Sequence, residues 1–468
     1  MVDVVLIAPA DHTHFRKRLG LKAPPLNLMY LASSLRESGF SVRIIDDNVE
    51  GAGPDGIARS LGNDTKLVGL TAATSTLNSA IHYTDAIKRR NEGTVTVLGG
   101  PHVSFLPEET LERGRSVDVA VMGEGEDTIV EVASTLERKG DLGGVKGVAF
   151  RAGNEVRVND PREMRVDIDS FPLPARDLIH LDDYKDPVKK RPIGTMITSR
   201  GCVFGCAYCA SSRMMGQRFR ARSPTSIVDE MEVLMGLGTE DIEFIDDIFV
   251  LNQKRATEVA REIRRRGLDV QFSASSRVDT VSRPLVKELQ GAGLSSLYLG
   301  IESGSQRILD LMGKGTTLAQ AHDAVRTAKD LNVRVLGSFI LGYPGETLKE
   351  MDETIRLSIK LGVDYAQFSL LTPYPGTPIF EHLRSQGLIS TQDYDNFTAG
   401  DPVIDYDRLG VGRKAVSRKL AMAYFRFYMR PSYLLKHPYV LSMIPRAIFP
   451  RDEAKKKRQF GGNTDGAV

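Results

Sequence analysis

The cysteines of this chain are confined to one short segment. Three occur among the 468 residues, and they lie within eight residues of one another, at Cys202, Cys206 and Cys209. Three thiolates on one loop can all reach a single metal centre, and the neighbouring Gly201 and Gly205 let the backbone fold around it. The C-x-x-x-C-x-x-C spacing therefore predicts a metal site, whereas three cysteines are too few for a disulfide framework.

The ligands that are missing nearby indicate the kind of metal centre. A structural zinc ion requires four ligands, and no histidine lies between His180 and His322. A cluster of four irons that is held by three cysteines keeps one iron open, and that iron can bind and polarise a substrate. The segment therefore favours an open iron-sulfur cluster over a zinc site or a set of buried thiols.

The elements that must position this loop run from residue 194 to about residue 375. Short β-branched runs alternate there with helical patterns, and strands are predicted at residues 194–200, 241–247, 269–276, 295–301, 334–342 and 364–373. Six such units are too few to close an eight-stranded barrel. They are enough for a partial (β/α)6, TIM-like barrel with its site at the carboxyl ends of the strands.

The motifs at those strand ends resemble the radical S-adenosylmethionine (SAM) superfamily, in which an aromatic residue, here Tyr208, precedes the last cysteine. The resemblance covers residues 194–375 and implies a 4Fe-4S cluster whose open iron chelates the amino and carboxylate groups of SAM. It also implies that Arg277 and Glu302 hold the carboxylate, amino or ribose groups and that Tyr208 lies near the adenine. An electron donor such as ferredoxin or flavodoxin would allow the cluster to cleave SAM into a 5'-deoxyadenosyl radical.

Residues 1–140 follow a second α/β pattern. Strands that are apolar on both faces are predicted at residues 2–9, 41–46, 66–73, 94–100 and 117–123, with amphipathic helices between them. Such strands pair in parallel through right-handed crossovers, which predicts a flavodoxin-like, Rossmann-type domain. Residues 141–193 contain a hairpin at 147–158 and a proline-rich run, and we interpret them as a linker.

The loops of this first domain resemble those of the cobalamin-binding family. They contain, in order, Asp46, Asn48 and Gly51, then Ser75 and Leu77, then Gly99 and Gly100, and finally Gly123 and Glu124. The first three groups match the D-x-H-x-x-G, S-x-L and G-G motifs of that family, and the GEGE stretch at 123–126 is typical of cobalamin-dependent radical SAM enzymes. By this resemblance the nucleotide tail lies beside the glycine pair, and Ser75 hydrogen-bonds its base.

Asn48 is a departure from the family pattern, because it stands where the histidine that coordinates cobalt would be. We therefore expect cobalamin with no histidine on the cobalt. A flavodoxin-like domain that has lost its ligand is the alternative. The formal G-x-G-x-x-G at residues 51–56 is a weaker motif, since Pro54 interrupts it and it does not lie on the first βα turn.

The cysteine count excludes relatives that need a second cluster or a methyl-carrying cysteine, such as methylthiotransferases and ribosomal-RNA adenine methylases. One cluster and one cobalamin imply that one SAM supplies a methyl group through the cobalamin, while a second supplies the radical. The resemblance thus predicts C-methylation of an unactivated carbon by a class B-type radical SAM methyltransferase. Ring closure or carbon-carbon coupling stays open, as does a non-enzymatic cobalamin sensor with a structural metal site.

The chain from residue 376 onward is predicted to be helical and basic. Residues 408–458 include 14 Lys and Arg and two acidic residues, although the whole chain has a net charge of +2. Aromatic and apolar residues alternate with the basic ones, and prolines interrupt them, which is closer to an interfacial segment than to a nucleic-acid surface. We expect a cap on the barrel that also contacts anionic membrane, a disordered last dozen residues, and no nucleic-acid partner.

The same features lead to the expected substrate and location. A basic, apolar-rich end and a barrel that is open at one side suggest a hydrophobic or amphiphilic small molecule or a lipid as substrate. No apolar run reaches the roughly 18 residues of a membrane span, and the chain start reads as a strand. We therefore expect a cytoplasmic protein that associates peripherally with the membrane.

Overall fold

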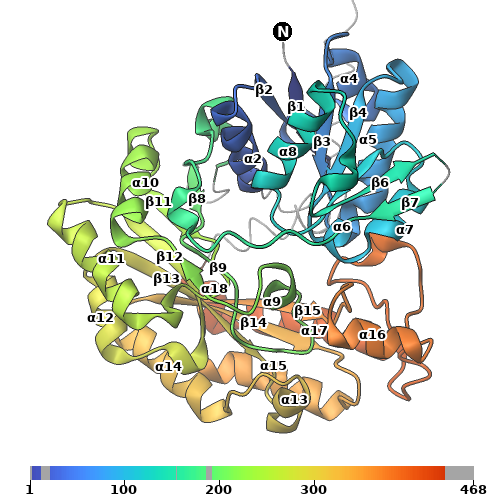
Figure 1. Ribbon diagram of the computed structural model, residues 1–468. Coiled ribbons are helices and arrows are strands. Elements are labelled where there is room, and N and C mark those ends of the chain that lie inside the picture. Colours follow the sequence, from blue (N-terminus) through green and yellow to red (C-terminus); the bar gives the residue numbers. More distant parts are fainter. Residues whose placement is uncertain (1–2, 12–21, 154, 186–191, 438–468) are drawn as a thin grey trace, which may run out of the picture.

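The computed structural model describes residues 3–11, 22–153, 155–185 and 192–437. Within these ranges the chain forms an N-terminal α/β domain, an irregular connecting segment and a second α/β domain with a helical extension (Figure 1). Predictions for residues 438–468, including the disordered end and the most basic stretch, lie outside the described residues.

The N-terminal domain is a seven-stranded sheet with the order β2-β1-β3-β4-β5-β6-β7. Its strands are β1 (Val4–Ala8), β2 (Val42–Asp46), β3 (Leu67–Thr71), β4 (Val95–Gly99), β5 (Val119–Val121), β6 (Val148–Ala152) and β7 (Glu155–Val158). Its helices are α2 (Leu26–Glu37), α3 (Asp47–Glu50), α4 (Gly53–Ser60), α5 (Leu77–Arg90), α6 (Pro101–Phe105), α7 (Pro107–Arg113) and α8 (Glu126–Glu137). Strands β1 to β5 pair in parallel, which confirms the predicted flavodoxin-like arrangement.

The hairpin at 147–158 lies inside the range interpreted as a linker, yet it belongs to this first sheet. Strand β6 pairs antiparallel with β5, and β7 pairs antiparallel with β6. The buried face of β6 shares the apolar core of the neighbouring strands, and this contact is long-range information that the local pattern of the hairpin does not contain.

The second domain is a six-stranded, all-parallel sheet with the order β15-β14-β13-β12-β11-β8. Its strands are β8 (Ile193–Met196), β11 (Asp241–Phe244), β12 (Gln271–Arg277), β13 (Leu294–Glu302), β14 (Arg334–Leu341) and β15 (Tyr365–Leu370). A separate antiparallel pair is formed by β9 (Ser199–Arg200) and β10 (Arg220–Ala221). The six parallel strands confirm the predicted partial barrel.

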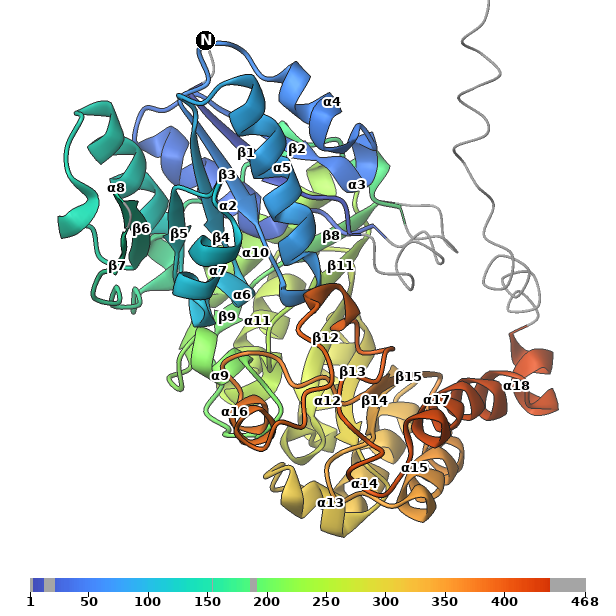
Figure 2. The ribbon, with the colours of Figure 1, turned by 90° about the vertical axis from the view of Figure 1, so that its right-hand side faces the viewer.

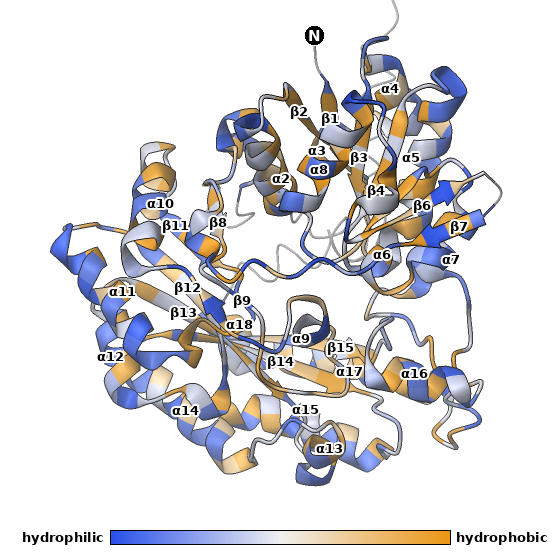
Figure 3. Cartoon of the chain, in the orientation of Figure 1, coloured by the Kyte–Doolittle hydropathy of each residue, from blue (hydrophilic) through white to orange (hydrophobic). Residues whose placement is uncertain are grey.

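Helices cover the outside of the second domain. They are α9 (Ser211–Met214), α10 (Pro224–Gly236), α11 (Gln253–Arg265), α12 (Arg283–Gln290), α13 (Gln306–Leu311), α14 (Leu318–Asp330), α15 (Leu348–Leu361), α16 (Pro378–Ser385), α17 (Arg413–Tyr428) and α18 (Pro431–Lys436). The helix ends follow their sequence signals: the Ser223 side chain caps α10, and α15 begins with a Thr347–Glu350 capping box and ends at left-handed Gly362. Figure 3 shows apolar strands inside and polar residues on the outward faces of the helices.

Helix α17 closes the open edge of the second sheet with tyrosine hydroxyls. The Tyr428 hydroxyl accepts from the amide of Ala366 at 3.1 Å and donates to the carbonyl of the same residue at 2.8 Å. Tyr424 makes the same pair of bonds to Phe368, at 3.3 and 2.8 Å. These hydroxyls replace the missing neighbour strand, which protects an edge that would otherwise be open to another chain. Figure 2 shows α17 beside β15.

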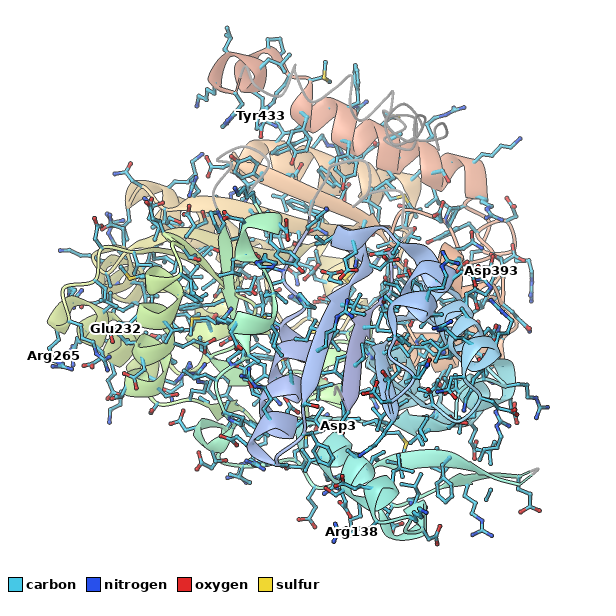
Figure 4. The ribbon with its side chains drawn as sticks, turned by 90° about the horizontal axis from the view of Figure 1, so that it is seen from above. Asp3, Arg138, Glu232, Arg265, Asp393 and Tyr433 are labelled. Atoms are coloured by element: carbon cyan, nitrogen blue, oxygen red, sulfur yellow. The ribbon has the colours of Figure 1, made fainter. Side chains whose placement is uncertain are left out.

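The basic helical extension is therefore anchored through its aromatic residues. Tyr433 of α18 donates to the carbonyl of Asp364 at 3.0 Å and is labelled beside α18 in Figure 4. Among the described residues, the two most exposed large apolar side chains lie on α17 and α18: Phe425 is 66% exposed and Leu435 is 84% exposed. No helix among the described residues is long and apolar enough to cross a membrane.

Candidate active site

The cysteine loop leaves β9 and returns through α9. Cys206 is buried, and Cys202 and Cys209 are partly buried; all three thiols are free. The loop is held by backbone bonds from Cys202 to the carbonyl of Gly216 at 3.2 Å and from Ala207 to the carbonyl of Met312 at 2.9 Å. Burial raises the pKa of the Cys202 and Cys209 thiols, a cost that metal coordination can offset by stabilising the thiolates.

Gly201 is required where the loop begins. Its φ is +88°, and a Cβ atom there would lie 2.3 Å from the carbonyl oxygen of Arg218. Any other residue would therefore be strained and would clash with backbone. The close approach packs the start of the cysteine loop directly against the segment that follows the loop.

Arg277, at the end of β12, lies beneath this loop. Its guanidinium stands 3.6 Å from the centroid of the Phe204 ring, and one of its nitrogens is 3.8 Å from the sulfur of Cys206. It also donates to Asp279 at 2.9 and 3.0 Å and to the carbonyl of Lys314 at 2.7 Å. Arg277 thus meets the cysteine loop, and most of its donors hold protein groups.

Tyr208 and Glu302 meet through a residue that the sequence did not single out. The Lys314 ammonium lies 2.8 Å from a Glu302 carboxylate oxygen and 3.3 Å from the Tyr208 hydroxyl. Glu302 ends β13 with a φ of +68°, at a shift in strand register, and its side chain folds back over Gly300. A Cβ on Gly300 would lie 2.5 Å from that carboxylate, so the glycine makes room for the cluster of three side chains.

Lys314 gave one weak signal in the sequence. It stands between Gly313 and Gly315, both of which have positive φ, in the loop after α13. Tight glycine turns bring a side chain close to another backbone, but they do not indicate which one. Burial and the charge of Glu302 raise the pKa of Tyr208, so its hydroxyl stays protonated.

The acidic pair at the end of β11 divides into two roles. Asp246 is buried and accepts hydrogen bonds from the amide of Thr198 at 2.6 Å and from the hydroxyls of Thr198 and Ser199, so it braces the chain that leads to the cysteines. Asp247 is partly exposed on the cysteine side, where it interacts with Ser211. Burial raises the pKa of Asp247.

The loop after β14 supports the Lys314 loop from the far side. Glu346 accepts from the amides of Gly342 at 2.6 Å and Tyr343 at 3.1 Å, and the Tyr343 hydroxyl donates to the carbonyl of Leu311 at 3.1 Å. Burial raises the pKa of Glu346 to about 8. This carboxyl holds the loop together, and the loop in turn holds the segment before Lys314.

The donor set fits a 4Fe-4S cluster better than a single ion. In the part of the chain that the structure describes, no three His, Cys, Asp or Glu side chains converge on a point that could hold one metal ion. A zinc ion requires such convergence, but an iron-sulfur cluster does not, because each thiolate binds a different iron. Three free thiols on a partly buried loop therefore match a cluster with one open iron.

On the N-terminal domain, the loop after β2 is occupied by its own contacts. Asp46 accepts from the amide and the side-chain nitrogen of Asn48, at 3.0 and 2.8 Å, and from the Tyr184 hydroxyl at 2.9 Å. The side-chain oxygen of Asn48 accepts from the amide of Asp11 at 2.7 Å. Gly51 ends α3 in the left-handed conformation, with φ +62°. Asn48 therefore ties the loops after β1 and β2 together.

The loops after β3 and β4 lie side by side. Ser75 is partly exposed in the turn before α5, whereas Leu77 is fully buried and belongs to the core. Gly100 has a φ of +111°, and a Cβ there would lie 2.7 Å from the carbonyl oxygen of Ala72. Gly100 thus lets the chain after β4 turn directly against the backbone after β3, at the carboxyl edge of the sheet.

His102 is a buried residue at the same edge. One ring nitrogen lies 3.4 Å from the Thr74 hydroxyl. The centroids of the His102 and Tyr394 rings are 4.5 Å apart, and the two rings pack edge to face. Burial lowers the pKa of His102 to about 4, so the imidazole is neutral. Asp393, next to Tyr394, accepts from the Asn78 side chain at 3.1 Å and is labelled beside the N-terminal domain in Figure 4.

Gly123 and Glu124, the last of the predicted cobalamin-binding residues, lie where the first domain contacts the second. Gly123 has a φ of +71°, and its amide donates to the Ser104 hydroxyl at 2.9 Å. The Glu124 side chain is 8% exposed and accepts from Arg200 at 2.9 Å and from Arg220 at 2.8 Å. Burial alone would raise the pKa of Glu124, but the two guanidinium groups outweigh it and lower that pKa. The carboxyl edge of the first sheet therefore lies against the ribbon that carries the cysteines.

Comparison with known proteins supports both halves of this arrangement. The B12 binding domain model matches residues 15–133, and the Radical SAM superfamily model matches residues 196–358. An uncharacterized methyltransferase of Pyrococcus horikoshii is 39% identical over 439 residues, which cover 93% of this chain and 94% of that protein. The anaerobic magnesium-protoporphyrin IX monomethyl ester cyclase of Cereibacter sphaeroides is 28% identical over 93% of this chain and 72% of its own length.

A solved structure has the same fold. It is that of OxsB, a cobalamin-dependent SAM radical enzyme, with aqua-cobalamin and SAM bound. It matches with a TM-score of 0.76 at 19% identity, over 96% of this chain and 72% of the other. Both domains and their order are therefore shared.

Proposed function

Because the chain belongs to the cobalamin-dependent radical SAM enzymes, we propose that it methylates an unactivated carbon of a hydrophobic or amphiphilic substrate. The observation that carries this proposal is the direct contact between the cysteine loop's ribbon and the carboxyl edge of the cobalamin-type sheet. A methyl donor and a radical generator must face one substrate, and this contact brings their two binding regions together.

The chain's own residues divide the work of binding. Cys202, Cys206 and Cys209 would hold the cluster, and the carboxylate of Glu302 and the ammonium of Lys314 would meet the amino, carboxylate or ribose groups of SAM. The chemistry supplied by the bound cofactors is a one-electron cleavage of SAM, which gives the hydrogen-abstracting radical, and a methyl group for the carbon so activated. A one-electron donor such as ferredoxin or flavodoxin completes the system.

The cobalamin contacts are part of the same proposal. Gly99, Gly100 and Ser75 lie at the carboxyl edge of the first sheet, where we expect the nucleotide tail of cobalamin to bind. Asn48 has its side-chain oxygen on the amide of Asp11 and carries no imidazole, so we expect cobalt without a protein histidine ligand.

The decisive experiment uses the anaerobically reconstituted chain with SAM, hydroxocobalamin and a strong reductant. We expect about four irons per chain and release of both 5'-deoxyadenosine and S-adenosylhomocysteine. A variant with Cys202, Cys206 and Cys209 all replaced by Ala should bind no iron and release no 5'-deoxyadenosine. Stoichiometric zinc in the wild type, or iron retained by the triple variant, would contradict the proposal.

Ring closure is the second candidate, and the likeness to the cyclase of Cereibacter sphaeroides favours keeping it. The two reactions differ in their by-products. Methylation releases S-adenosylhomocysteine together with 5'-deoxyadenosine, because one SAM gives its methyl group away. Release of 5'-deoxyadenosine alone in the presence of the true substrate would select ring closure or carbon-carbon coupling.

The substrate class and the membrane contact rest on the helical extension. Phe425 and Leu435 project from it among the exposed basic residues Arg418, Arg426 and Lys436. A peripheral contact of this kind combines buried apolar side chains with about 1 kcal/mol for each Lys or Arg near an anionic surface. We propose that this face brings the barrel to a membrane that contains a lipid or isoprenoid-like substrate.

Sedimentation with lipid vesicles tests that contact. We expect the full chain to sediment with vesicles that contain phosphatidylserine at low salt and to detach as salt screens the charges. A Phe425→Ser, Leu435→Ser double variant should sediment less, while an Ile245→Ser variant, which removes an exposed apolar side chain of the barrel, should behave as wild type. Equal sedimentation with neutral vesicles, or none at all, would favour a small molecule taken from solution.

A further inference from the structure

Two buried glutamates of the N-terminal domain bind two buried arginines of the second domain. Glu124 lies in the loop after β5, and Glu126 begins α8. Glu124 binds Arg200 at 2.9 Å and Arg220 at 2.8 Å, and Glu126 binds Arg200 at 2.5 Å. All four side chains are less than one tenth exposed. We call these four residues the inter-domain clamp.

The clamp stabilises the two-stranded ribbon β9–β10, because it balances the charges of two arginines that face each other in it. Arg200 and Arg220 are direct partners in this two-stranded antiparallel pair. Like charges that face each other across a strand pair are destabilising, and burial increases the repulsion. The carboxylate of Glu124 binds both guanidinium groups and that of Glu126 binds Arg200, so two negative charges balance the two positive ones.

The ribbon carries both ends of the cysteine loop. Arg200 directly precedes Gly201 and Cys202, and Arg220 closes the segment that returns from α9. Between them, the amide of Cys202 donates to the carbonyl of Gly216 at 3.2 Å. A shift of the arginines would therefore move the first cysteine with them.

Further contacts hold the side chains of Arg200 and Arg220 in place. The Arg200 guanidinium lies 4.7 Å from the centroid of the Phe171 ring and 5.4 Å from that of Tyr30, so rings of the connecting segment and of α2 enclose it. Arg220 donates further to the carbonyls of Arg165 at 2.8 Å and Met215 at 2.9 Å. Both Glu124 oxygens bind guanidinium groups, so this carboxylate ties the two arginines to the loop after β5.

We propose that Glu124 and Glu126 are positioning residues, which fix the cysteine loop relative to the cobalamin-type sheet through Arg200 and Arg220. The proposal rests on the proposed function, because it concerns the separation of the two cofactor sites. A displacement of about 1 Å in a catalytic constellation can cost about 100-fold in rate. The clamp thus keeps the methyl donor and the radical source in reach of one substrate carbon.

A Glu124→Gln variant tests this role, because it keeps the shape of the side chain and removes its charge. We expect unchanged iron and cobalamin contents but a displaced and broadened dipolar coupling between cob(II)alamin and the reduced cluster in pulsed EPR. The S-adenosylhomocysteine formed in a single turnover with reduced cobalamin should appear about 100-fold more slowly. The 5'-deoxyadenosine formed by the cluster should fall much less, since SAM binds to the cysteine side.

Glu137→Gln is the matched control. Glu137 ends helix α8, which Glu126 begins, and forms an exposed ion pair with Lys66 at 3.5 Å. It should leave the dipolar coupling at the wild-type value. Glu126→Gln, which removes one of the three ion pairs, should shift the coupling in the same direction as Glu124→Gln but less. If Glu124→Gln does not fold, this second variant decides.

Two results would overturn the clamp. A wild-type coupling in Glu124→Gln, or in Glu126→Gln where the first does not fold, would show that the ion pairs do not set the geometry. Loss of cobalamin alone, with the iron retained, would make Glu124 a cobalamin contact instead. Neither result touches the proposed function, which is tested separately by the iron, the cobalamin and the two released products of the wild-type chain and by the iron content of the triple cysteine variant.

Discussion

The ion pair of Lys314 and Glu302 yields a prediction about both stability and SAM binding. The two charged atoms are 2.8 Å apart, and the side chains are 6% and 9% exposed. Removing one partner of a buried pair leaves an uncompensated charge and typically costs about 3–5 kcal/mol. We therefore expect Lys314→Met to lower the free energy of unfolding by about 3–5 kcal/mol.

The double variant separates the pair from its surroundings. In Lys314→Met combined with Glu302→Gln no charge is left unpaired, so we expect a coupling energy of about 2 kcal/mol and a stability closer to wild type. The chain contains no tryptophan, so unfolding in urea is followed by far-ultraviolet circular dichroism of the cofactor-free chain at neutral pH. The matched control is Lys254→Met, which removes an exposed partner of Glu258 at 3.9 Å and should change stability by less than about 1 kcal/mol.

The functional part of this prediction concerns SAM. Lys314→Met keeps all three cysteines, so the iron content should stay at the wild-type level. The change that SAM causes in the EPR spectrum of the reduced cluster should require at least about ten times more SAM, which corresponds to the loss of one charge-assisted hydrogen bond. A loss of stability below about 1 kcal/mol in Lys314→Met, or additive effects in the double variant, would refute the reasoning.

Two further perturbations test the fold around the site. Burial lowers the pKa of His102 to about 4. Between pH 6.5 and pH 4 the unfolded chain therefore takes up a proton at this residue, whereas the folded chain does not. The free energy of unfolding should fall by up to about 3 kcal/mol over this range. In urea titrations at several pH values, His102→Gln should make the free energy of unfolding depend less on pH, with Glu109 and Arg113 beside the ring left unchanged. The same pH dependence in wild type and variant would contradict the assignment of this effect to His102. Tyr428→Phe removes the hydroxyl that serves both the amide and the carbonyl of Ala366, and the urea midpoint should fall by an amount equivalent to about 1–3 kcal/mol. Because the amide and the carbonyl of Ala366 on the edge strand then lose their partner, light scattering should also show more self-association than in Tyr365→Phe, and equal scattering would argue against an edge-protecting role.

Much of the architecture follows from local patterns. Runs that are apolar on both faces, separated by helices with a serine or threonine start and a glycine stop, predict parallel βα units, and both sheets contain them. The cysteine spacing fixes three thiols on one loop, because seven residues of chain cannot separate them far. Arg277 and Glu302 were named through the family resemblance, and both lie at the carboxyl ends of neighbouring parallel strands, which meet at one edge.

The partners of the charged groups were decided by the tertiary structure. Lys314 lies 12 residues after Glu302 along a loop, and nothing in that spacing indicates that its ammonium turns back to the strand end. Glu124 stays a predicted cobalamin contact, and the packing of the two domains also places its oxygens on Arg200, 76 residues later, and on Arg220, 96 residues later. The sequence predicts that the basic extension caps the barrel and also contacts membrane, but it does not indicate that Tyr424 and Tyr428 hydrogen-bond an edge strand.

One physical cause explains why the sequence predicts the strands, the helices and the cysteine loop but not the partners of the buried charges. Periodicity and motif spacing report how a segment buries its own faces, and they determine strands, helices and the geometry of a single loop. A buried charge or a free strand edge is satisfied by whichever group the packing of distant segments brings within about 3 Å, and sequence distance carries no record of that choice. The sequence alone therefore determined the two cofactor-type domains and the thiols of this protein, and the packing of one domain on the other decided which charges hold them in place.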